Sequence, residues 1–259
     1  MSNKIPNLIT KNYPLRVSDF DRNNKILPAS VLDIFQDVAG VHAEMLGISG
    51  PQILEKNLCW MITRGRYEVI KQPRLYQNVV VKTWPVESRR IELDRDYEIC
   101  AEDGELLIKG TSQWVVMDIT DRSSPKLVPA RDFEIGLDEY VTERTFERAF
   151  TRAVYNNIES DEPYLCRSGY TDLDMNGHVN NVKYASFALN AIAGELPAGA
   201  EICDFRIDYT KEVLEGDVLK IHHAKSENED SSLTFTCRGA TDGTPVNFGV
   251  KLTVKRPLK

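Results

Sequence analysis

Three polar side chains at alternating positions, Asp174, Asn176 and His178, form the group in this sequence best suited to chemistry. In an extended segment alternate side chains point to the same side, so all three can face one pocket. A histidine can carry a proton near neutral pH, and an asparagine amide can orient a water or polarise a carbonyl. An aspartate can hold such neighbours by accepting their N–H bonds. We therefore expect an acid–base centre here.

A helix is predicted directly after this group. The apolar pattern over residues 181–196 is amphipathic, and the helix should begin near Asn180 or Asn181. The first N–H groups of a helix lack intrahelical partners and carry the positive end of the helix dipole, which suits a developing oxyanion. The alternative is that Asp174 and Asn176 only form an Asx-turn and an N-cap. Spacing alone does not decide between the two readings.

The same pattern occurs a second time, in degraded form. Residues 19–31 match residues 172–184 without gaps, with both aspartates and the asparagine repeated, but Lys25 stands where the second copy has His178. An apolar helical pattern over 29–46 follows the first copy. The chain therefore reads as a duplication with one reaction centre.

Strand patterns follow each predicted helix. Asp-Gly pairs at 103–104 and 242–243 predict hairpins. One long helix followed by an antiparallel meander, twice, predicts an α+β fold in which each half wraps a sheet round its helix. The predicted strands are 58–70, 78–84, 93–100 and 111–118 in the first half, and 202–210, 217–224, 232–239 and 246–255 in the second. A charged, weakly helical segment over 136–160 is expected to connect the halves.

Composition restricts the functional class. A net charge of −7 argues against broad nucleic-acid binding. No apolar run approaches the length of a membrane span, and residues 1–14 resemble neither a secretory signal nor a transit peptide, so a cytoplasmic location is expected. His222 and His223 are adjacent and would face opposite sides of a strand, so no metal site is predicted.

The residues around the polar group resemble a known family. The segment DMNGHVNNVKY (174–184) looks like the signature of acyl-acyl carrier protein thioesterases, the plant chain-terminating enzymes and their bacterial relatives. The likeness covers most of the chain in order and includes WMITR (60–64), YEV (67–69), TW (83–84), RR (89–90), TSQWVVM (111–117), YTKEV (209–213) and GD (216–217).

This resemblance implies a tandem, or double, hotdog fold with two antiparallel sheets, each wrapped round a long helix. The expected division is an N-terminal hotdog over 1–130 with the acyl-chain cavity, a linker over 131–160 and a catalytic C-terminal hotdog over 161–259. It also implies hydrolysis of an acyl thioester without a metal or organic cofactor.

The family pattern also implies roles for individual residues. Glu212 would be the general base acting on water, Asn176 and His178 would place the water and the thioester, and Asp174 would support them. A Lys-Glu pair on a strand is usually a surface pair, so the residues alone would not have selected Glu212. The ungapped repeat places Pro73 opposite Glu212, so the first half would lack both the histidine and the glutamate.

One residue departs from the family pattern. Many plant members carry a cysteine directly after the glutamate, once taken as a nucleophile, where this chain has Val213. Cys203 cannot simply replace it, by the two-residue alternation of a strand. We therefore expect water attack rather than a cysteine acyl-enzyme.

The resemblance suggests further contacts with the substrate. Trp60, Met61 and the 31–46 helix are candidates to line the acyl cavity, and Asn180 and Asn181 lie at the helix entrance. An acidic carrier protein would need a basic landing surface, for which the candidates are Arg64, Arg66, Lys71 and Arg74, with Arg89 and Arg90. A homodimer is the family-based expectation.

Three functions remain open from the sequence. The first is release of free fatty acid from an acyl carrier protein. The second is hydrolysis of acyl-CoA by the same residues. The third is a non-catalytic acyl-binding hotdog, against which the intact polar group argues.

Overall fold

The computed structural model describes residues 5–87, 90–147, 150 and 153–256. Arg89 lies outside them. The chain divides into two compact units, the first comprising residues 1–17, 33–65 and 70–149, the second 18–32, 66–69 and 150–259. The elements are β1 (Ile9–Pro14), α1 (Pro28–Met45), α2 (Gly50–Leu54), β2 (Leu58–Val69), β3 (Asn78–Pro85), β4 (Leu93–Ala101), β5 (Leu106–Asp118), β6 (Lys126–Val128), β7 (Tyr164–Arg167), α3 (Asn181–Ile192), β8 (Glu201–Tyr209), β9 (Val218–Glu227), β10 (Leu233–Ala240) and β11 (Phe248–Lys255), with short 3-10 turns at Val17–Asp19, Ala130–Asp132 and Tyr170–Asp172.

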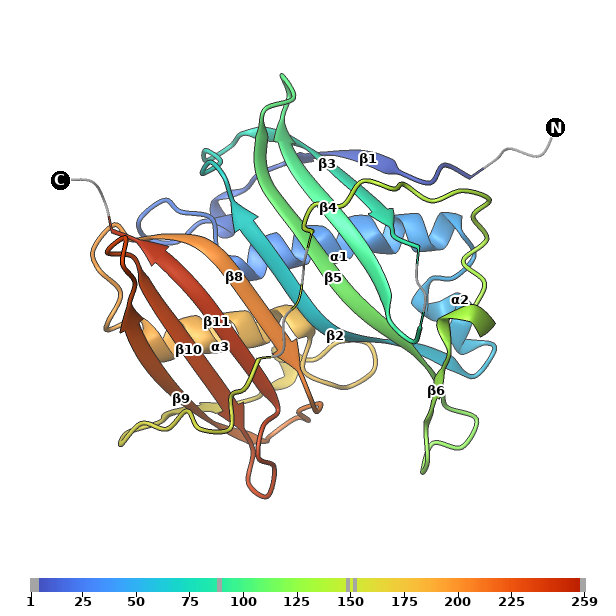
Figure 1. Cartoon of the computed structure of the whole chain (residues 1–259). Coiled ribbons are helices and arrows are strands. Elements are labelled where there is room, and N and C mark those ends of the chain that lie inside the picture. The colour runs from blue at the N-terminus through green and yellow to red at the C-terminus, as the bar shows by residue number, and fades with distance from the viewer. Residues whose placement is uncertain (1–4, 88–89, 148–149, 151–152, 257–259) are drawn as a thin grey trace. The chain divides into compact units, whose positions relative to one another are not determined.

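The strands of the first unit pair in antiparallel fashion, and α1 lies along them (Figure 1). Its strands follow the order β1-β3-β4-β5-β2, with β6 paired to β5. Phe35 of α1 stacks on Tyr97 of β4 with ring centroids 4.3 Å apart. The Phe35 ring fills the space over Gly110, where a Cβ atom would lie 2.2 Å from it. A side chain on β5 at this point would therefore push the helix off the sheet.

The second unit repeats this arrangement with α3 (Figure 1). Its strands follow the order β8-β11-β10-β9-β7. Tyr184 of α3 packs edge-on against Phe248 of β11, with ring centroids 5.0 Å apart. The Phe248 ring in turn occupies the space over Gly239, where a Cβ atom would lie 1.9 Å from it. Each unit thus buries an aromatic ring over at least one strand glycine.

Most predicted elements are confirmed. The long helices, the eight predicted strands and both Asp-Gly hairpins are present, although α3 ends at Ile192 rather than 196. β1, β7, α2 and β6 were not predicted. The meander order is wrong in one respect, because β8 pairs with β11 and not with β9, and β2 takes the corresponding place beside β5. In each unit, therefore, the first of the four predicted strands lies beside the last of them.

The segment expected to be weakly helical, 136–160, contains no helix in its described residues. Arg144 and Thr145 instead bind the buried carboxylate of Asp96, whose side chain is 0% exposed. Arg144 Nε and the Thr145 backbone N–H donate to Asp96 Oδ2 at 3.0 and 2.9 Å. The Thr145 hydroxyl donates to the Gly110 carbonyl at 3.0 Å. The connection is held on the first sheet because a buried carboxylate needs these donors.

One helix position that the sequence places on the apolar stripe of α1 carries a histidine. His42 is 0% exposed, and its Nε2 lies 2.9 Å from the Pro6 carbonyl oxygen. Its Nδ1 lies 3.2 Å from Arg95 Nη1. An arginine only donates, so Nδ1 accepts and Nε2–H donates to Pro6. Burial first, and the Arg95 charge second, lower the pKa of His42 from 6.5 to about 4.

This histidine predicts how stability depends on pH. The unfolded chain binds a proton at His42 below pH 6.5, whereas the folded chain resists it until about pH 4. The stability that neutral His42 provides is therefore complete above its unfolded pKa and is lost as pH falls through this window. His42→Gln keeps one donor for Pro6 and one acceptor for Arg95. We expect the difference in unfolding free energy between wild type and variant, measured in urea, to shrink as pH falls. A difference that stays constant with pH would contradict this account of His42.

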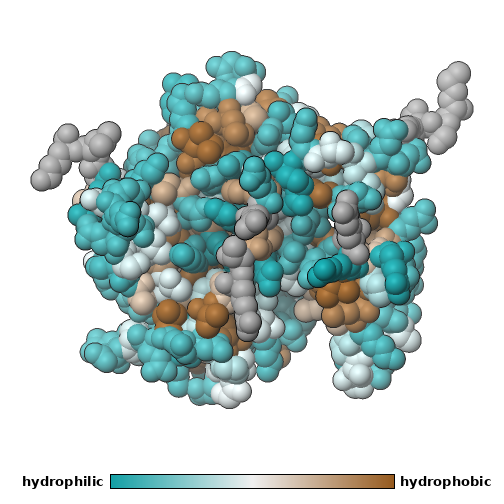
Figure 2. All heavy atoms as spheres, viewed as in Figure 1, coloured by the Kyte–Doolittle hydropathy of each residue, from teal (hydrophilic) through white to brown (hydrophobic). Residues whose placement is uncertain are grey.

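Among the described residues, no helix is both long and apolar enough to cross a membrane. Hydrophilic side chains predominate on the face shown in Figure 2, with small hydrophobic patches among them.

Candidate active site

The loop that carries the predicted acid–base group lies in the second unit and is closed by Asp174. Asp174 Oδ1 accepts the backbone N–H groups of Asn176 at 2.8 Å and of His178 at 3.3 Å. The Asp174 N–H donates to the His178 carbonyl at 2.8 Å. Gly177 makes the turn possible with φ of 78°. The Asx-turn therefore exists, and it presents Asn176 and His178 as exposed side chains.

The first copy of the loop is built with the same bonds. Asp21 Oδ1 accepts the N–H groups of Asn23 at 2.8 Å and of Lys25 at 2.9 Å, and the Asp21 N–H donates to the Lys25 carbonyl at 2.8 Å. Asn24 takes the place of Gly177, with φ of 59°. The Lys25 ammonium pairs with Glu201. Because Asp21 does this where no histidine is present, the first role of Asp174 is to close the loop.

The structure brings the loop against the segment that carries Glu212. His178 forms an isolated antiparallel bridge with Leu214, and the Val179 N–H donates to the Val213 carbonyl at 2.9 Å. Glu212, like His178, is exposed. The four predicted catalytic residues thus lie on two adjoining backbone segments of one unit.

The same carboxylates affect the pKa of a buried tyrosine. Tyr184 is 3% exposed, and burial is the main reason that the pKa of its hydroxyl is raised. The charges of Glu212 and Asp174, with Asp217, raise it further. The Tyr184 hydroxyl also accepts the Val213 N–H at 3.2 Å, so it lies beside the segment that carries Glu212.

The start of α3 is capped by its own sequence. Asn180 is the N-cap, and its Oδ1 accepts the Val182 N–H at 3.1 Å while its carbonyl accepts the Lys183 N–H at 2.9 Å. The Asn181 carbonyl accepts the hydroxyl of Tyr209 at 3.0 Å. Asn180 thus occupies two of the N–H groups that the sequence offered to an oxyanion.

Hydrogen bonds correct the match between the halves beyond the helices. The Thr210 and Lys211 N–H groups donate to the Asn247 carbonyl at 2.8 and 3.1 Å, as the Ile70 and Lys71 N–H groups donate to the Leu107 carbonyl at 2.9 and 3.1 Å. Tyr76 and Gly216 share a positive φ, of 60° and 82°. Lys211 therefore matches Lys71, and Glu212 matches Gln72. The ungapped pairing of Glu212 with Pro73 is wrong by one residue. Gln72 in the first half has the shape of the Glu212 side chain but not its charge.

The candidate residues for the acyl cavity lie in the first unit. Trp60 donates its indole N–H to the Ile48 carbonyl at 2.7 Å and packs edge-on against Trp114 and Phe133. It belongs to the packing at the α2 end of this unit. Met61, the next residue on β2, is 42% exposed. Their role in binding substrate stays a prediction.

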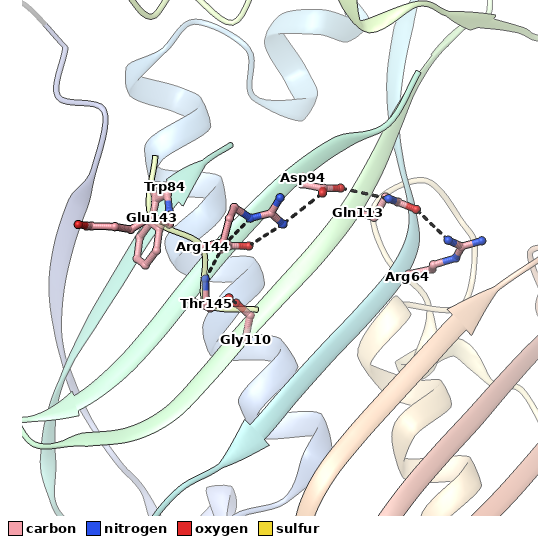
Figure 3. Close-up of polar contacts among 9 residues, drawn as sticks. Arg64, Trp84, Asp94, Gly110, Gln113, Glu143, Arg144 and Thr145 are labelled. Atoms are coloured by element: carbon pink, nitrogen blue, oxygen red, sulfur yellow. Dashed lines mark hydrogen bonds and ion pairs between the residues drawn. The ribbon is translucent and has the colours of Figure 1, made fainter. Parts of the chain in front are cut away.

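The four basic candidates differ in their partners. Arg66 Nη2 lies 2.7 Å from Asp204 Oδ2, and Lys71 Nζ lies 2.7 Å from Glu105 Oε2. Arg64 donates to the Gln113 side chain at 3.3 Å (Figure 3). The exposed Arg74 has no carboxylate partner among the described residues. The structure does not test whether any of them binds a carrier.

Two further groups bear on the chemistry. Cys203 lies on β8, where its thiol donates to the Thr253 carbonyl and burial raises its pKa, which opposes formation of a thiolate. His223 pairs with Glu195, with Nε2 and Oε1 2.6 Å apart, and His222 Nδ1 accepts the Ser160 N–H at 3.1 Å. Both histidines are engaged within the fold.

Comparison with protein families decides the identity of the chain. Residues 6–130 match the acyl-ACP thioesterase N-terminal domain and residues 155–248 match the acyl-ACP thioesterase C-terminal domain. The chain belongs to the acyl-ACP thioesterase family. Both segments that carry the predicted catalytic residues, 172–180 and 210–217, fall inside the C-terminal match.

Individual relatives agree with this assignment. The chain is 24% identical over 250 residues to the palmitoyl-acyl carrier protein thioesterase of Gossypium hirsutum, covering 89% of this chain and 59% of the relative. It is 26% identical over 236 residues to the oleoyl-acyl carrier protein thioesterase of Coriandrum sativum, covering 86% and 64%. The chain spans about half to two thirds of the length of these curated relatives.

Solved structures show the same fold. An acyl-ACP thioesterase from Bacteroides thetaiotaomicron superposes with a TM-score of 0.78 at 23% identity, over 96% of this chain and 98% of that one. The 12:0-ACP thioesterase from Umbellularia californica gives a TM-score of 0.78 at 19% identity, over the same shares. The hotdog-like fold of this family is therefore present here.

The two loop copies allow a controlled test of Asp174. Removing the carboxylate in Asp174→Ala or Asp21→Ala deletes two equivalent bonds to backbone N–H groups. We expect each to lower the unfolding free energy by about 1–3 kcal/mol, since bonds to charged groups are of that size. Only Asp174→Ala should also lower kcat/KM for an acyl thioester, by about tenfold or more, because only its loop holds the reacting side chains. Equal loss of activity in both variants would show that the effect is on the fold as a whole.

Proposed function

We propose that this thioesterase family member hydrolyses fatty acyl-acyl carrier protein thioesters to free fatty acid and carrier protein. The family matches to both of its domains support this function, and the plant relatives carry names of the same activity. We further propose that its two units form a tandem hotdog, each sheet wrapped round one long helix. The repeated loop, helix and hairpin pattern of the two units supports that division.

In the proposed mechanism Glu212 acts as general base on water. The water oxygen attacks the thioester carbonyl carbon while its proton passes to the Glu212 carboxylate. The carbonyl oxygen then carries negative charge, for which the side chains of Asn176 and His178 are the nearby donors. Collapse of the intermediate breaks the C–S bond, and the leaving thiolate takes the proton from the Glu212 carboxyl group, which restores the carboxylate. No step needs a metal or an organic cofactor.

The observation that carries this proposal is the backbone contact between the two catalytic segments. His178 forms a bridge with Leu214, and the Val179 N–H donates to the Val213 carbonyl. The histidine loop is therefore attached to the two residues that follow Glu212. Nothing comparable supports a cysteine nucleophile. Val213 is 0% exposed, and Cys203 lies within a strand and has a raised pKa.

Glu212→Gln tests the base, because the chain itself carries glutamine at the matching position of the first half. The variant keeps the size of the side chain but cannot accept the proton. We expect kcat/KM to fall by roughly 10²–10⁴-fold with an unchanged melting temperature. The substrates are acyl-carrier-protein thioesters from C8 to C18 and the matching acyl-CoAs. Cys203→Ser is the control, and it should keep activity.

The outcomes separate the candidate functions. Activity on acyl-CoA alone would keep the mechanism but remove the carrier protein as substrate. Binding of acyl ligands without hydrolysis of either thioester would make this a non-catalytic acyl-binding protein. Loss of activity in Cys203→Ser together with an active Glu212→Gln would replace the base mechanism with a covalent one.

We also propose that the basic residues Arg64, Arg66, Lys71 and Arg74 help to bind the acidic carrier. Arg74 offers the clearest test, because reversing its charge breaks no ion pair among the described residues. We expect Arg74→Glu to raise KM for acyl-carrier substrates several-fold, through lost attraction. The KM for short synthetic thioesters should not change. Equal changes in KM for both kinds of substrate would contradict a role of Arg74 in carrier binding. A cytoplasmic location and a homodimer remain predictions.

A further inference from the structure

The segment that carries Glu212 is not part of a strand, so its backbone depends on side chains from other elements. It follows β8 directly, and the side chain of Asn247, just before β11, lies against it. Asn247 is 1% exposed, and its Nδ2 donates to the Glu212 carbonyl at 3.2 Å. The same amide accepts the Thr241 N–H through Oδ1 at 2.7 Å. One buried amide thus connects the end of a hairpin to the backbone of the proposed base.

A second side chain binds the other polar group of the same peptide unit, the one that follows Glu212. The N–H of Val213 donates to the hydroxyl oxygen of Tyr184 at 3.2 Å. The Tyr184 ring is fixed by edge-on packing against Tyr209, with ring centroids 5.7 Å apart, and against Phe248. The peptide group that follows Glu212 is therefore held by α3 through Tyr184 and by the residue just before β11, Asn247.

The first half has no polar side chain at the positions that match Tyr184 and Asn247. By the loop match, Tyr184 corresponds to Val31, which is 0% exposed. By the hydrogen bonds of its carbonyl, Asn247 corresponds to Leu107, which is 1% exposed. The residue that corresponds to Val213 is Pro73, which has no N–H to donate. The half that carries Gln72 in place of Glu212 therefore has no tyrosine hydroxyl, no backbone N–H and no asparagine amide at these three matching positions.

We propose that Tyr184 and Asn247 are positioning residues that hold Glu212 in place for its reaction with water. This inference rests on the proposed role of Glu212 as the base. Leu107 shows that the backbone fold at this point needs no amide side chain, and Val31 shows that the helix needs no tyrosine. The polar groups are therefore extra features of the half that keeps the base.

Tyr184→Phe is the direct test. It removes the acceptor for Val213 and leaves the ring in place. We expect kcat for an acyl thioester to fall by about 10- to 100-fold, with KM within about twofold of wild type, because a displaced base affects the reaction and not substrate binding. Tyr155→Phe is the matched control. Its buried hydroxyl donates to Asp208 at 2.5 Å on β8, so it loses a comparable bond without touching the Glu212 segment.

A second variant separates positioning from stability. Tyr184→Phe leaves a buried N–H unsatisfied, which by itself weakens the fold. Adding Val213→Pro, the residue found in the first half, removes that donor and should restore the melting temperature. We expect kcat to stay low in this double variant. Recovery of kcat together with stability would overturn the proposal.

A double-mutant cycle separates this inference from the proposed function. If Tyr184 and Asn247 act through Glu212, then Tyr184→Phe and Asn247→Ser should cause no further loss of kcat in a Glu212→Gln background. Full additive losses would overturn the positioning role while leaving the base intact. An active Glu212→Gln single variant would overturn the proposed base itself.

Discussion

The candidate site depends on how a short loop that lies outside the named strands satisfies its own backbone. Buried or turning N–H groups need acceptors, and in this loop the carboxylate of Asp174 supplies one oxygen to two of them. That closure sets the direction of the chain as it enters α3, and so it sets where Asn176 and His178 lie. If the loop opened, the histidine would lose its place beside the Glu212 segment even with every side chain present.

The duplication makes it possible to separate scaffold from chemistry within one chain. The aspartate and the positive-φ residue occur in both loops with the same backbone bonds, so they belong to the scaffold. An asparagine also occurs in both loops, but a role in the reaction is proposed only for Asn176. The residues that differ include the histidine and the proposed base, together with those proposed to hold the base. In the order second half and first half, these pairs are His178 and Lys25, Glu212 and Gln72, Tyr184 and Val31, Asn247 and Leu107, and Val213 and Pro73.

The sequence predicted the elements well because their patterns are local. The apolar period of the long helices and the Asp-Gly hairpins depend on residues close together in the chain, and both appear as predicted. The site loop was found because its spacing and its copy are also local. Glu212 came only from the family resemblance, since nothing near it in sequence marks it as reactive.

Other features depended on contacts between distant residues. Asn247 reads as an ordinary polar residue before a strand, and its bond to the Glu212 carbonyl arises only once β11 is placed. The partner of β8 is β11 rather than its neighbour in sequence, which alternation along one strand cannot indicate. The one-residue error in matching Glu212 had the same origin. The positions correspond through their bonds to Asn247 and Leu107, and such bonds have no signature in an ungapped comparison.

The capped start of α3 changes where charge stabilisation must come from. An uncapped helix would offer several N–H groups to an oxyanion, but Asn180 takes those of Val182 and Lys183. In the proposed reaction the oxyanion must then be stabilised by side chains of the loop. One amide hydrogen of Asn176 is directed to Asp174 Oδ2 at 3.3 Å, which orients the amide and leaves its second hydrogen for the substrate. A donor of this kind is effective only if it is held still before the charge develops. The closure by Asp174 therefore serves the reaction as well as the fold.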